Sequence, residues 1–312
     1  MTGRKGRGRG GEGVRLLLVF VLGAAVGIAA WVFAPRFLAR TEGTRDGRPR
    51  AEQPTPVPAR PRPAATPAPA RPRAPHPPGD FEAAGGGGGA LAIVLDDVGH
   101  SAESLERLSR LSGPLALAVL PDAPHAAEAA ALARKEGWDL LVHLPMAPLG
   151  GGGEPGAIGP GDDAETIGAR VEAALARVPG AIGLNNHQGS GATADRRVMR
   201  AVLSVVKRHG LFFLDSRTSA ATVGEAEARR LGVATLARDV FLDAVRAEAP
   251  GRAVPPGALE AAWEKAVETA RANGQCVVIG HPHPDTLGFL ERQLGALARR
   301  GILRVRVSEL VE

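Results

Sequence analysis

The fold of this chain is decided by the stretch Leu91-Ala92-Ile93-Val94-Leu95-Asp96-Asp97-Val98-Gly99-His100. Five apolar residues end directly in two neighbouring carboxylates. A short apolar run that follows glycines and stops at polar residues predicts a buried strand of a parallel sheet. The carboxyl ends of such strands are where α/β folds place their chemistry. We therefore expect the ends of other strands to supply partners for Asp96 and Asp97.

The same pattern recurs along residues 90–312, where short apolar runs alternate with stretches of helical periodicity. The expected strands cover residues 91–95, 115–120, 139–146, 181–184, 211–215, 233–237, 277–280 and 302–307. The expected helices cover 101–111, a segment ending at 134, 163–178 (capped by Asp162 or Asp163), 195–209, 256–273 and 285–299. This alternation is typical of βα units around a parallel sheet or barrel. Seven or eight units in this length predict a small or incomplete barrel.

Charge is divided unevenly along the chain. Residues 1–89 carry 14 Lys and Arg against 6 Asp and Glu, a net charge of +8, and residues 90–312 carry 24 against 27, a net charge of −3. A nucleic-acid-binding domain concentrates basic charge in its fold, so we expect no nucleic-acid partner. The single cysteine, Cys276, excludes an internal disulfide and a cysteine-based zinc cluster. Its apolar neighbours predict a buried core position.

The amino-terminal part predicts an anchor and a spacer. Residues 16–34 form a run of 19 without a charge, which is long enough to cross a bilayer as a helix, and the basic residues of the 1–15 tail favour a cytoplasmic amino terminus. A cleaved signal peptide is the alternative, but Pro35 is a poor residue after a cleavage site, and we favour the anchor. Residues 35–89 predict a disordered linker, since 12 of the 26 prolines lie between positions 41 and 80.

Six of the seven histidines in residues 90–312 lie within or just after an expected strand. In a parallel barrel these strand ends share one face. The side chains expected to converge there are Asp96, Asp97, His143, His187, Asp215, Arg238, Asp239 and His281. Imidazoles and carboxylates without a thiolate suit Zn²⁺ or another divalent ion with an open coordination position.

Each of these residues could also have a purely structural role and take no part in a functional site. Asp97 could cap the following helix, and Asp96 could pair with Arg217 or Arg238. His143 could be a hydrogen-bonded core histidine. Turns, rigid loops or rim positions would account in the same way for Asn185, Asn186, His281, His283, His100 and His125. We favour a functional role for the two carboxylates, and convergence on one face favours it for the set.

Six blocks of sequence together resemble the divergent polysaccharide deacetylases, relatives of the NodB-type carbohydrate esterases. In chain order they read IVLDDVG at 93–99, HLPM at 143–146, LNNHQGS at 184–190, DSRT at 215–218, RDVFLD at 238–243 and GHPHP at 280–284. The resemblance covers nearly all of residues 90–312. It implies a deformed (β/α)₇ barrel that uses a divalent metal to remove acetyl groups from N-acetylated glycans.

The resemblance also implies roles for individual residues. Asp96 would be the catalytic base, Asp97 a metal ligand and His281 the catalytic acid. The related family has two histidine ligands in one turn, whereas this chain has only His143 there. His187 on the next strand would take the place of the second histidine. The resemblance then implies Asp97, His143 and His187 as the ligands of a divalent metal, for which we expect Zn²⁺.

The remaining expectations concern the substrate and the location. Arg238 would orient Asp96 or stabilise charge in the reaction. The substrate-binding residues would be Asn185, Asn186, Asp215, Arg217, Asp239 and His283. The expected partner is an N-acetylated cell-envelope polysaccharide, acted on by a single-pass bacterial inner-membrane protein with its globular domain in the periplasm or outside the cell. The alternatives are a non-catalytic, metal-containing glycan-binding or scaffold protein on the same fold, and a metal-dependent hydrolase of other amides or esters.

Overall fold

The computed structural model describes residues 88–244 and 254–311. The predicted tail, anchor and most of the linker, at residues 1–87, lie outside this part of the chain. Among the described residues, no helix combines the length and the apolar character needed to cross a membrane.

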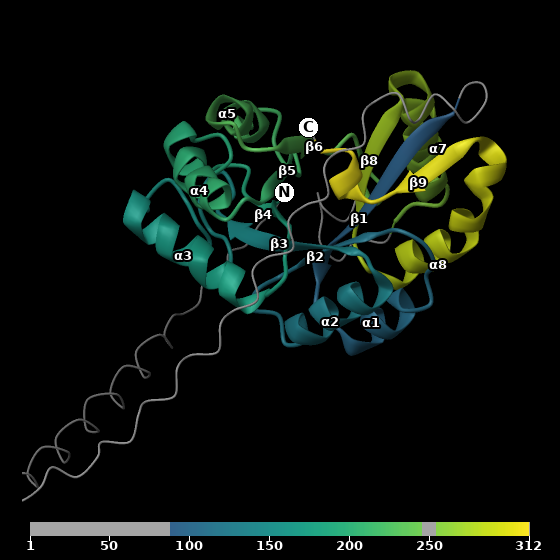
Figure 1. Cartoon of the computed structure of the whole chain (residues 1–312), viewed down its shortest axis with the longest axis horizontal. Helices are drawn as coiled ribbons and strands as arrows, with labels where there is room; N and C mark the ends of the chain where they lie inside the picture. Colours follow the sequence, from purple (N-terminus) through teal and green to yellow (C-terminus); the bar gives the residue numbers. More distant parts are fainter. Residues whose placement is uncertain (1–87, 245–253, 312) are drawn as a thin grey trace, which may run out of the picture. The chain divides into compact units, whose positions relative to one another are not determined.

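A curled, wholly parallel sheet of nine strands forms the centre of the fold. The strands are β1 (Gly89–Val98), β2 (Ala116–Val119), β3 (Asp139–Met146), β4 (Gly183–Gln188), β5 (Phe212–Asp215), β6 (Thr235–Ala237), β7 (Val240–Phe241), β8 (Gln275–Gly280) and β9 (Ile302–Val305). Their order is β6-β5-β4-β3-β2-β1-β8-β7, and β9 pairs with β1. The order follows the chain around a ring that stays open between β6 and β7, so the fold is a half-barrel. Figure 1 shows the curl of the sheet.

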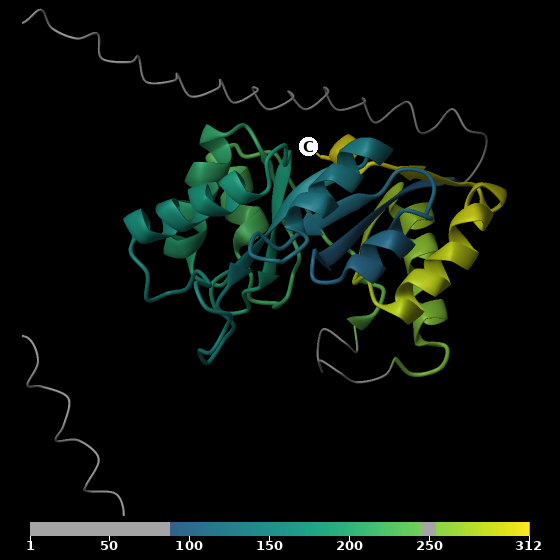
Figure 2. The ribbon, with the colours of Figure 1, turned by 90° about the horizontal axis from the view of Figure 1, so that it is seen from below.

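Helices cover the outer face of the curled sheet (Figures 1 and 2). They are α1 (Ala102–Leu108), α2 (Ala126–Glu136), α3 (Ala164–Arg177), α4 (Arg196–Arg208), α5 (Gly224–Leu231), α7 (Ala258–Asn273) and α8 (Pro284–Gln293). Three short 3₁₀ segments, at Leu294–Ala296, Ala298–Arg300 and Val307–Glu309, complete the carboxyl-terminal part.

Alternation along β1 shows how the sequence builds two apolar layers. Leu91 and Ile93 belong to the large cluster between sheet and helices, whereas Ala92 and Val94 belong to a smaller cluster inside the curl. Successive side chains of a strand point to opposite faces, so a strand buried on both faces must be apolar throughout. On β1 the residues inside the curl are smaller than those that face the helices.

The half-barrel agrees with the expected incomplete barrel of βα units, and most expected elements are present. Asp163 caps α3 by accepting a 2.8 Å hydrogen bond from the Thr166 backbone NH. Two elements were not expected: α5, which is eight residues long and begins at Gly224, and β7, which has only two residues. The expected helix at 285–299 is shorter, because α8 ends at Gln293 and gives way to 3₁₀ turns.

Candidate metal centre and active site

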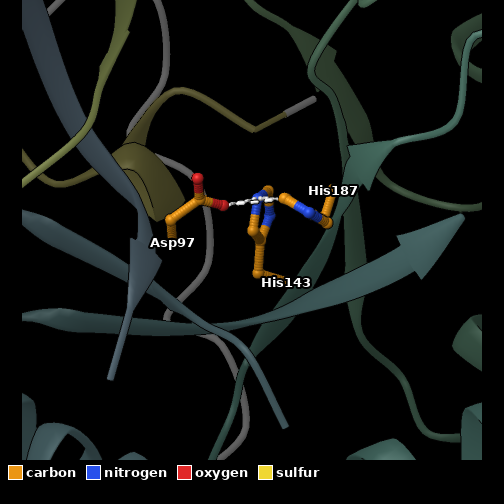
Figure 3. A group of neighbouring side chains, drawn as sticks. All are labelled: Asp97, His143 and His187. Atoms are coloured by element: carbon orange, nitrogen blue, oxygen red, sulfur yellow. Dashed lines mark hydrogen bonds and ion pairs between the residues drawn. The ribbon is translucent and has the colours of Figure 1, made fainter. Parts of the chain in front are cut away.

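Three side chains from the strands β1, β3 and β4 meet at the carboxyl-terminal edge of the sheet. Asp97 comes from the end of β1, His143 from β3 and His187 from β4 (Figure 3). Asp97 Oδ1 lies 3.1 Å from His143 Nε2 and 2.8 Å from His187 Nδ1, and the two nitrogens lie 3.2 Å apart. The structure therefore brings together the three residues predicted as metal ligands.

The geometry of this group fits a metal ion. Tetrahedral bonds of about 2.0–2.1 Å would place neighbouring ligand atoms roughly 3.3 Å apart, close to the three separations seen here. Asp97 Oδ1 is also a buried oxygen to which no group of the described residues donates a hydrogen bond of good geometry. An anionic oxygen left in this way beside two imidazole nitrogens is what a shared cation would satisfy.

The charge state of Asp97 suits a ligand. Burial acts against the charged form, but the close His143 and His187 rings outweigh it and hold the pKa of Asp97 well below its ordinary value. The same interactions act on the partner ring: burial opposes protonation of His143, yet the negative charges of Asp96 and Asp97 raise its pKa. A bound cation would replace that proton as the positive partner of the carboxylates.

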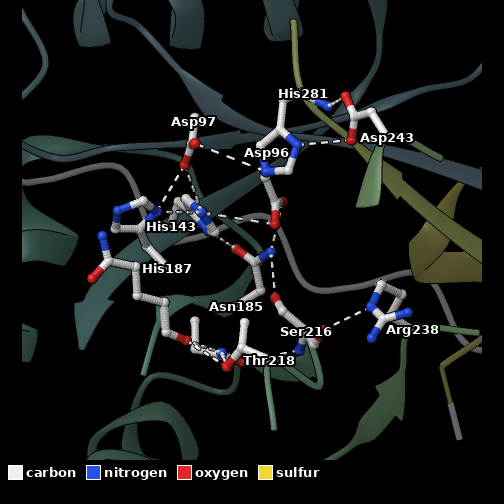
Figure 4. Close-up of polar contacts among 12 residues, drawn as sticks. Asp96, Asp97, His143, Asn185, His187, Ser216, Thr218, Arg238, Asp243 and His281 are labelled. Carbon is white, nitrogen blue, oxygen red and sulfur yellow. Dashed lines mark hydrogen bonds and ion pairs between the residues drawn. The ribbon is translucent and has the colours of Figure 1, made fainter. Parts of the chain in front are cut away.

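Asn185 connects the metal group to Asp96. Its Nδ2 donates hydrogen bonds to Asp96 Oδ1 (2.8 Å) and Ser216 Oγ (3.2 Å), so its Oδ1 is the atom that accepts from His143 Nδ1 (2.8 Å; Figure 4). With the proton of His143 held on Nδ1, the Nε2 lone pair faces Asp97. Fixing the tautomer of a metal-ligating histidine in this way is the usual task of its outer hydrogen-bond partner.

Asp96 lies beside the group and is buried. Its Oδ2 is 3.7 Å from His143 Nε2. Burial raises the pKa of Asp96, and the nearby His143 and His281 rings oppose that shift without cancelling it. The carboxylate is thus more basic than an exposed aspartate, as a general base requires.

His281, at the end of β8, faces the group from the other side. Its Nδ1 contacts Asp243 Oδ1 at 2.9 Å, and its Nε2 lies 3.8 Å from Asp97 Oδ2 (Figure 4). Asp243 is fixed in turn, because its Oδ2 accepts from the His281 backbone NH and from Thr286 Oγ1. Burial opposes the charged ring, but the bond to Asp243 prevails and raises the pKa of His281 to about 9.

Arg238 follows β6 directly and makes its hydrogen bonds to the turn after β5. Its Nε donates to the Ser216 carbonyl (2.7 Å) and its Nη2 to the Arg217 carbonyl (2.9 Å), and its guanidinium lies 3.9 Å from the centre of the Phe241 ring. In the described part of the chain no hydrogen bond joins Arg238 to Asp96. Arg238 therefore holds the turn after β5 by hydrogen bonds, and it acts on Asp96 by charge, without a hydrogen bond between them.

Three predicted substrate-binding residues are buried and bonded within the protein. Asn185 is one. Asn186 accepts from the Ser216 backbone NH (2.9 Å), and Asp215 accepts from Thr222 Oγ1 (2.8 Å). Side chains with almost no exposed surface cannot reach a substrate in this conformation. Their placement favours a positioning role in place of the predicted substrate contact.

The other three predicted substrate-binding residues are exposed or partly exposed. Arg217 is paired with Glu225 at 2.7 Å. Asp239 is exposed, but one carboxylate oxygen accepts from the Val277 backbone NH on β8 (2.8 Å). His283 precedes α8 and its ring centroid is 6.0 Å from that of His281. Of the three, His283 is the one that the structure places against a residue of the site.

Several polar residues at this edge were not singled out from the sequence. Asp243 is one of them: it lies in the turn after β7, and the local sequence pattern gives no sign of its contact with His281. The backbone supplies a further feature: the non-glycine residues with positive φ in the described chain are Asp97 (55°), Gln188 (53°) and Arg217 (47°). All three stand at the ends of β1, β4 and β5, around the same edge. Backbone strain of this kind concentrates at functional sites.

Sequence relatives and a solved structure share this domain. The chain is 36% identical over 207 residues to the uncharacterized protein YibQ of Escherichia coli K12, a match that covers 66% of this chain and 62% of that protein. It is 35% identical over 205 residues to an uncharacterized protein of Haemophilus influenzae, covering 65% of this chain and 70% of that protein. The crystal structure of the uncharacterized protein ATU2773 from Agrobacterium tumefaciens superposes with a TM-score of 0.64 and 25% identity, covering 73% of this chain and 91% of the other.

The family is settled by a match that extends over nearly the whole described domain. Residues 93–311 match the model of the family described as divergent polysaccharide deacetylase. This range runs from β1 through the last 3₁₀ segment, and it includes every residue of the metal group and the Asp243–His281 pair. The chain therefore belongs to the divergent polysaccharide deacetylase family.

Proposed function

We propose that this protein is a metal-dependent hydrolase that removes N-acetyl groups from a cell-envelope polysaccharide. The observation that carries the proposal is the approach of Asp97 Oδ1, His143 Nε2 and His187 Nδ1 to within 3.2 Å of one another, with Asp96 on one side and His281 on the other. Membership in the deacetylase family supports the glycan as substrate class.

Asp97, His143 and His187 would hold the ion, for which Zn²⁺ is our choice because two of the three ligands are imidazoles. A divalent ion at such a site polarises a carbonyl oxygen and lowers the pKa of water. Asp96 would accept the proton of the attacking water, since Asn185 holds one of its oxygens and burial makes it more basic.

His281 would protonate the amine that leaves when the amide bond breaks. Asp243 binds Nδ1, so the proton available for donation is on Nε2, the nitrogen that faces the metal group. A pKa of about 9 keeps the ring protonated at neutral pH. His281 thus carries the proton that a general acid needs.

A second candidate is a glycan-binding or scaffold protein that retains the metal group without catalysis. The burial of Asp96 favours it, because a carboxyl whose pKa is raised far enough stays protonated and cannot accept a proton. The envelope location in both candidates rests on the membrane anchor predicted at residues 16–34.

Acetate release from N-acetylglucosamine oligomers and from peptidoglycan tests the proposal. The purified protein is loaded with Zn²⁺, its metal content is measured, and wild type is compared with Asp96→Asn. We expect turnover by wild type and a loss of at least about a hundredfold in Asp96→Asn, the typical contribution of a general base. Full metal occupancy without turnover of any N-acetylated glycan would contradict the proposal, and retained glycan binding in that case would support the scaffold.

A further inference from the structure

We propose, on the basis of that proposed function, that Gln188 is a substrate-recognition residue whose side-chain amide binds an acetamido or hydroxyl group of the glycan. Gln188 is the last residue of β4 and follows the predicted ligand His187 directly. Three observations support this role: the backbone conformation at the strand end, the hydrogen bonds that hold it, and the exposure of the side chain.

The backbone at Gln188 is in an unfavourable conformation. Its φ of 53° lies in the left-handed region, where the Cβ of an L-residue crowds the backbone. Glycine adopts this region without that cost, and asparagine tolerates it better than most residues. Glutamine has neither advantage, so the turn by itself gives no reason for glutamine at this position.

Two side chains hold the strained turn in place through one carbonyl group. Asn186 Nδ2 donates to the Gln188 carbonyl oxygen at 2.8 Å, and Thr218 Oγ1 donates to the same oxygen at 2.7 Å. Asn186 is buried and its Oδ1 accepts from the Ser216 backbone NH, so it ties β4 to the turn after β5. A buried amide is therefore used to keep Gln188 in its left-handed conformation.

The consequence of the turn is an exposed amide side chain on the residue that directly follows the predicted metal ligand His187. Along β4, Asn185 and His187 point to the inside of the curl, where they contact Asp96 and Asp97. Regular alternation would turn Gln188 to the same side as buried Asn186. The left-handed residue breaks this alternation, and the side chain of Gln188 is exposed.

The chemistry of this group matches a neutral sugar substituent. A carboxamide offers two N–H donors and one carbonyl acceptor and carries no charge. Acetamido and hydroxyl groups likewise both donate and accept. An uncharged amide on the residue that follows His187 can thus align an N-acetylated residue without competing for the cation.

Two variants separate recognition from a purely structural turn. In Gln188→Gly the left-handed strain is relieved and the amide is lost, whereas Gln188→Glu keeps the length and the strain but replaces the NH₂ donor by a charged oxygen. We expect Gln188→Gly to melt at a higher temperature than wild type. In both variants we expect KM for the N-acetylglucosamine pentamer to rise about tenfold with kcat within about twofold, the loss of roughly one hydrogen bond of binding.

Calorimetric titration of the same pentamer into the zinc-loaded proteins measures glycan binding independently of turnover. Wild type that binds the pentamer without turnover, with binding weakened about tenfold in both variants, would support recognition by Gln188 and count against deacetylation of this glycan. A more stable Gln188→Gly with unchanged KM and unchanged binding would overturn the inference, because Gln188 would then be only a turn residue. Wild type that neither binds nor turns over the pentamer would also overturn it.

Discussion

The side-chain amide of Asn185 donates a hydrogen bond of 2.8 Å to Asp96, a residue 89 positions earlier in the sequence. The same amide accepts from His143, so one buried group touches both the proposed base and a proposed metal ligand. The strands β1 and β4 are not adjacent, because β2 and β3 lie between them in the sheet. The side chain of Asn185 nevertheless joins them. The position of Asp96 relative to the metal group thus depends on Asn185.

Replacing Asn185 by leucine should weaken metal binding and stability together. Without the acceptor for His143 Nδ1, the ring loses its fixed tautomer, and we expect zinc affinity to fall about 10–100-fold. The polar atoms of Asp96 and His143 left unpaired should lower the free energy of unfolding by about 1–3 kcal/mol each. Competition titration with a zinc chelator and urea denaturation measure the two effects.

Thr235→Val is the matched control for Asn185→Leu. Thr235 is buried on β6 and its hydroxyl donates to the Phe213 carbonyl (2.8 Å), away from the metal group. We expect it to lower stability while leaving zinc affinity unchanged. Equal zinc affinities in Asn185→Leu and wild type would contradict the positioning role of Asn185.

Zinc should stabilise the folded domain through Asp97. A ligand that binds only the native state at 100 times its Kd adds about 2.7 kcal/mol to the free energy of unfolding, so the melting temperature should rise with zinc and fall again with a chelator. Asp97→Asn should lose most of this rise, because the amide supplies no anionic ligand. Asp122→Asn, which changes a carboxylate with 71% of its side chain exposed, should keep it. A zinc-dependent rise of equal size in Asp97→Asn would place the ion elsewhere.

Much of the fold and of the metal group follows from local sequence pattern. The apolar runs predict parallel strands, and parallel strands bring their polar ends to one edge; Asp97, His143 and His187 lie together there. The pattern fails for elements that long-range packing stabilises. β7 has two residues, and α5 is short, begins at a glycine and has few apolar positions.

The roles of the polar side chains around that edge could not be predicted in the same way. Sequence marks Asn185 and Asn186 as polar residues at a strand end, and polar residues there are expected to face substrate. They are held by the side chains of Asp96 on β1 and His143 on β3 and by the backbone NH of Ser216 after β5, and no local pattern specifies these distances. The contact between Asp243 and His281 likewise joins the turn after the edge strand β7 to the residue that follows β8.

The pKa of His281 predicts a pH dependence of both stability and activity. Its folded value of about 9 is above the ordinary 6.5, so protonation stabilises the folded domain fully below about pH 6.5, and this contribution is lost as the pH rises through 9. A proton-donating His281 loses its proton over the same range, so kcat/KM should fall on the alkaline side. An ion at Asp97 opposes the imidazolium charge and should place this fall somewhat below pH 9.

Asp243→Asn tests the assignment, because the hydrogen bond to Asp243 is the main influence that raises the pKa of His281. We expect the alkaline fall in kcat/KM to move to lower pH. Imidazole chemical shifts followed by NMR in the metal-free protein give the pKa of His281 without any assay of activity. A pKa that is the same in Asp243→Asn and wild type would rule out Asp243 as the group that sets it.

Glu227, which is remote from the metal group, should make the stability of the domain fall at acid pH. Its carboxylate is buried on α5 under three arginines, accepting from Arg196 Nη1 (2.7 Å), Arg200 Nε (2.9 Å) and Arg230 Nε (2.9 Å). The bond from Arg200 is the largest influence that lowers its pKa from 4.5 to about 2. The contribution of Glu227 to stability is therefore complete above about pH 4.5 and is lost as the pH falls towards 2.

Urea denaturation of wild type and Glu227→Gln between pH 3 and 7 measures this contribution. Glutamine keeps the shape and loses the charge, so the variant should be less stable than wild type at pH 7, and the difference should shrink as the pH falls below about 4.5. Glu268→Gln, at an exposed position of α7, is the control for removing a negative charge from a helix. Because unfolding then requires no proton uptake at Glu227, the stability of Glu227→Gln should depend less steeply on pH than that of wild type or Glu268→Gln. Parallel curves for all three proteins would show that the arginines do not hold Glu227 in its charged form.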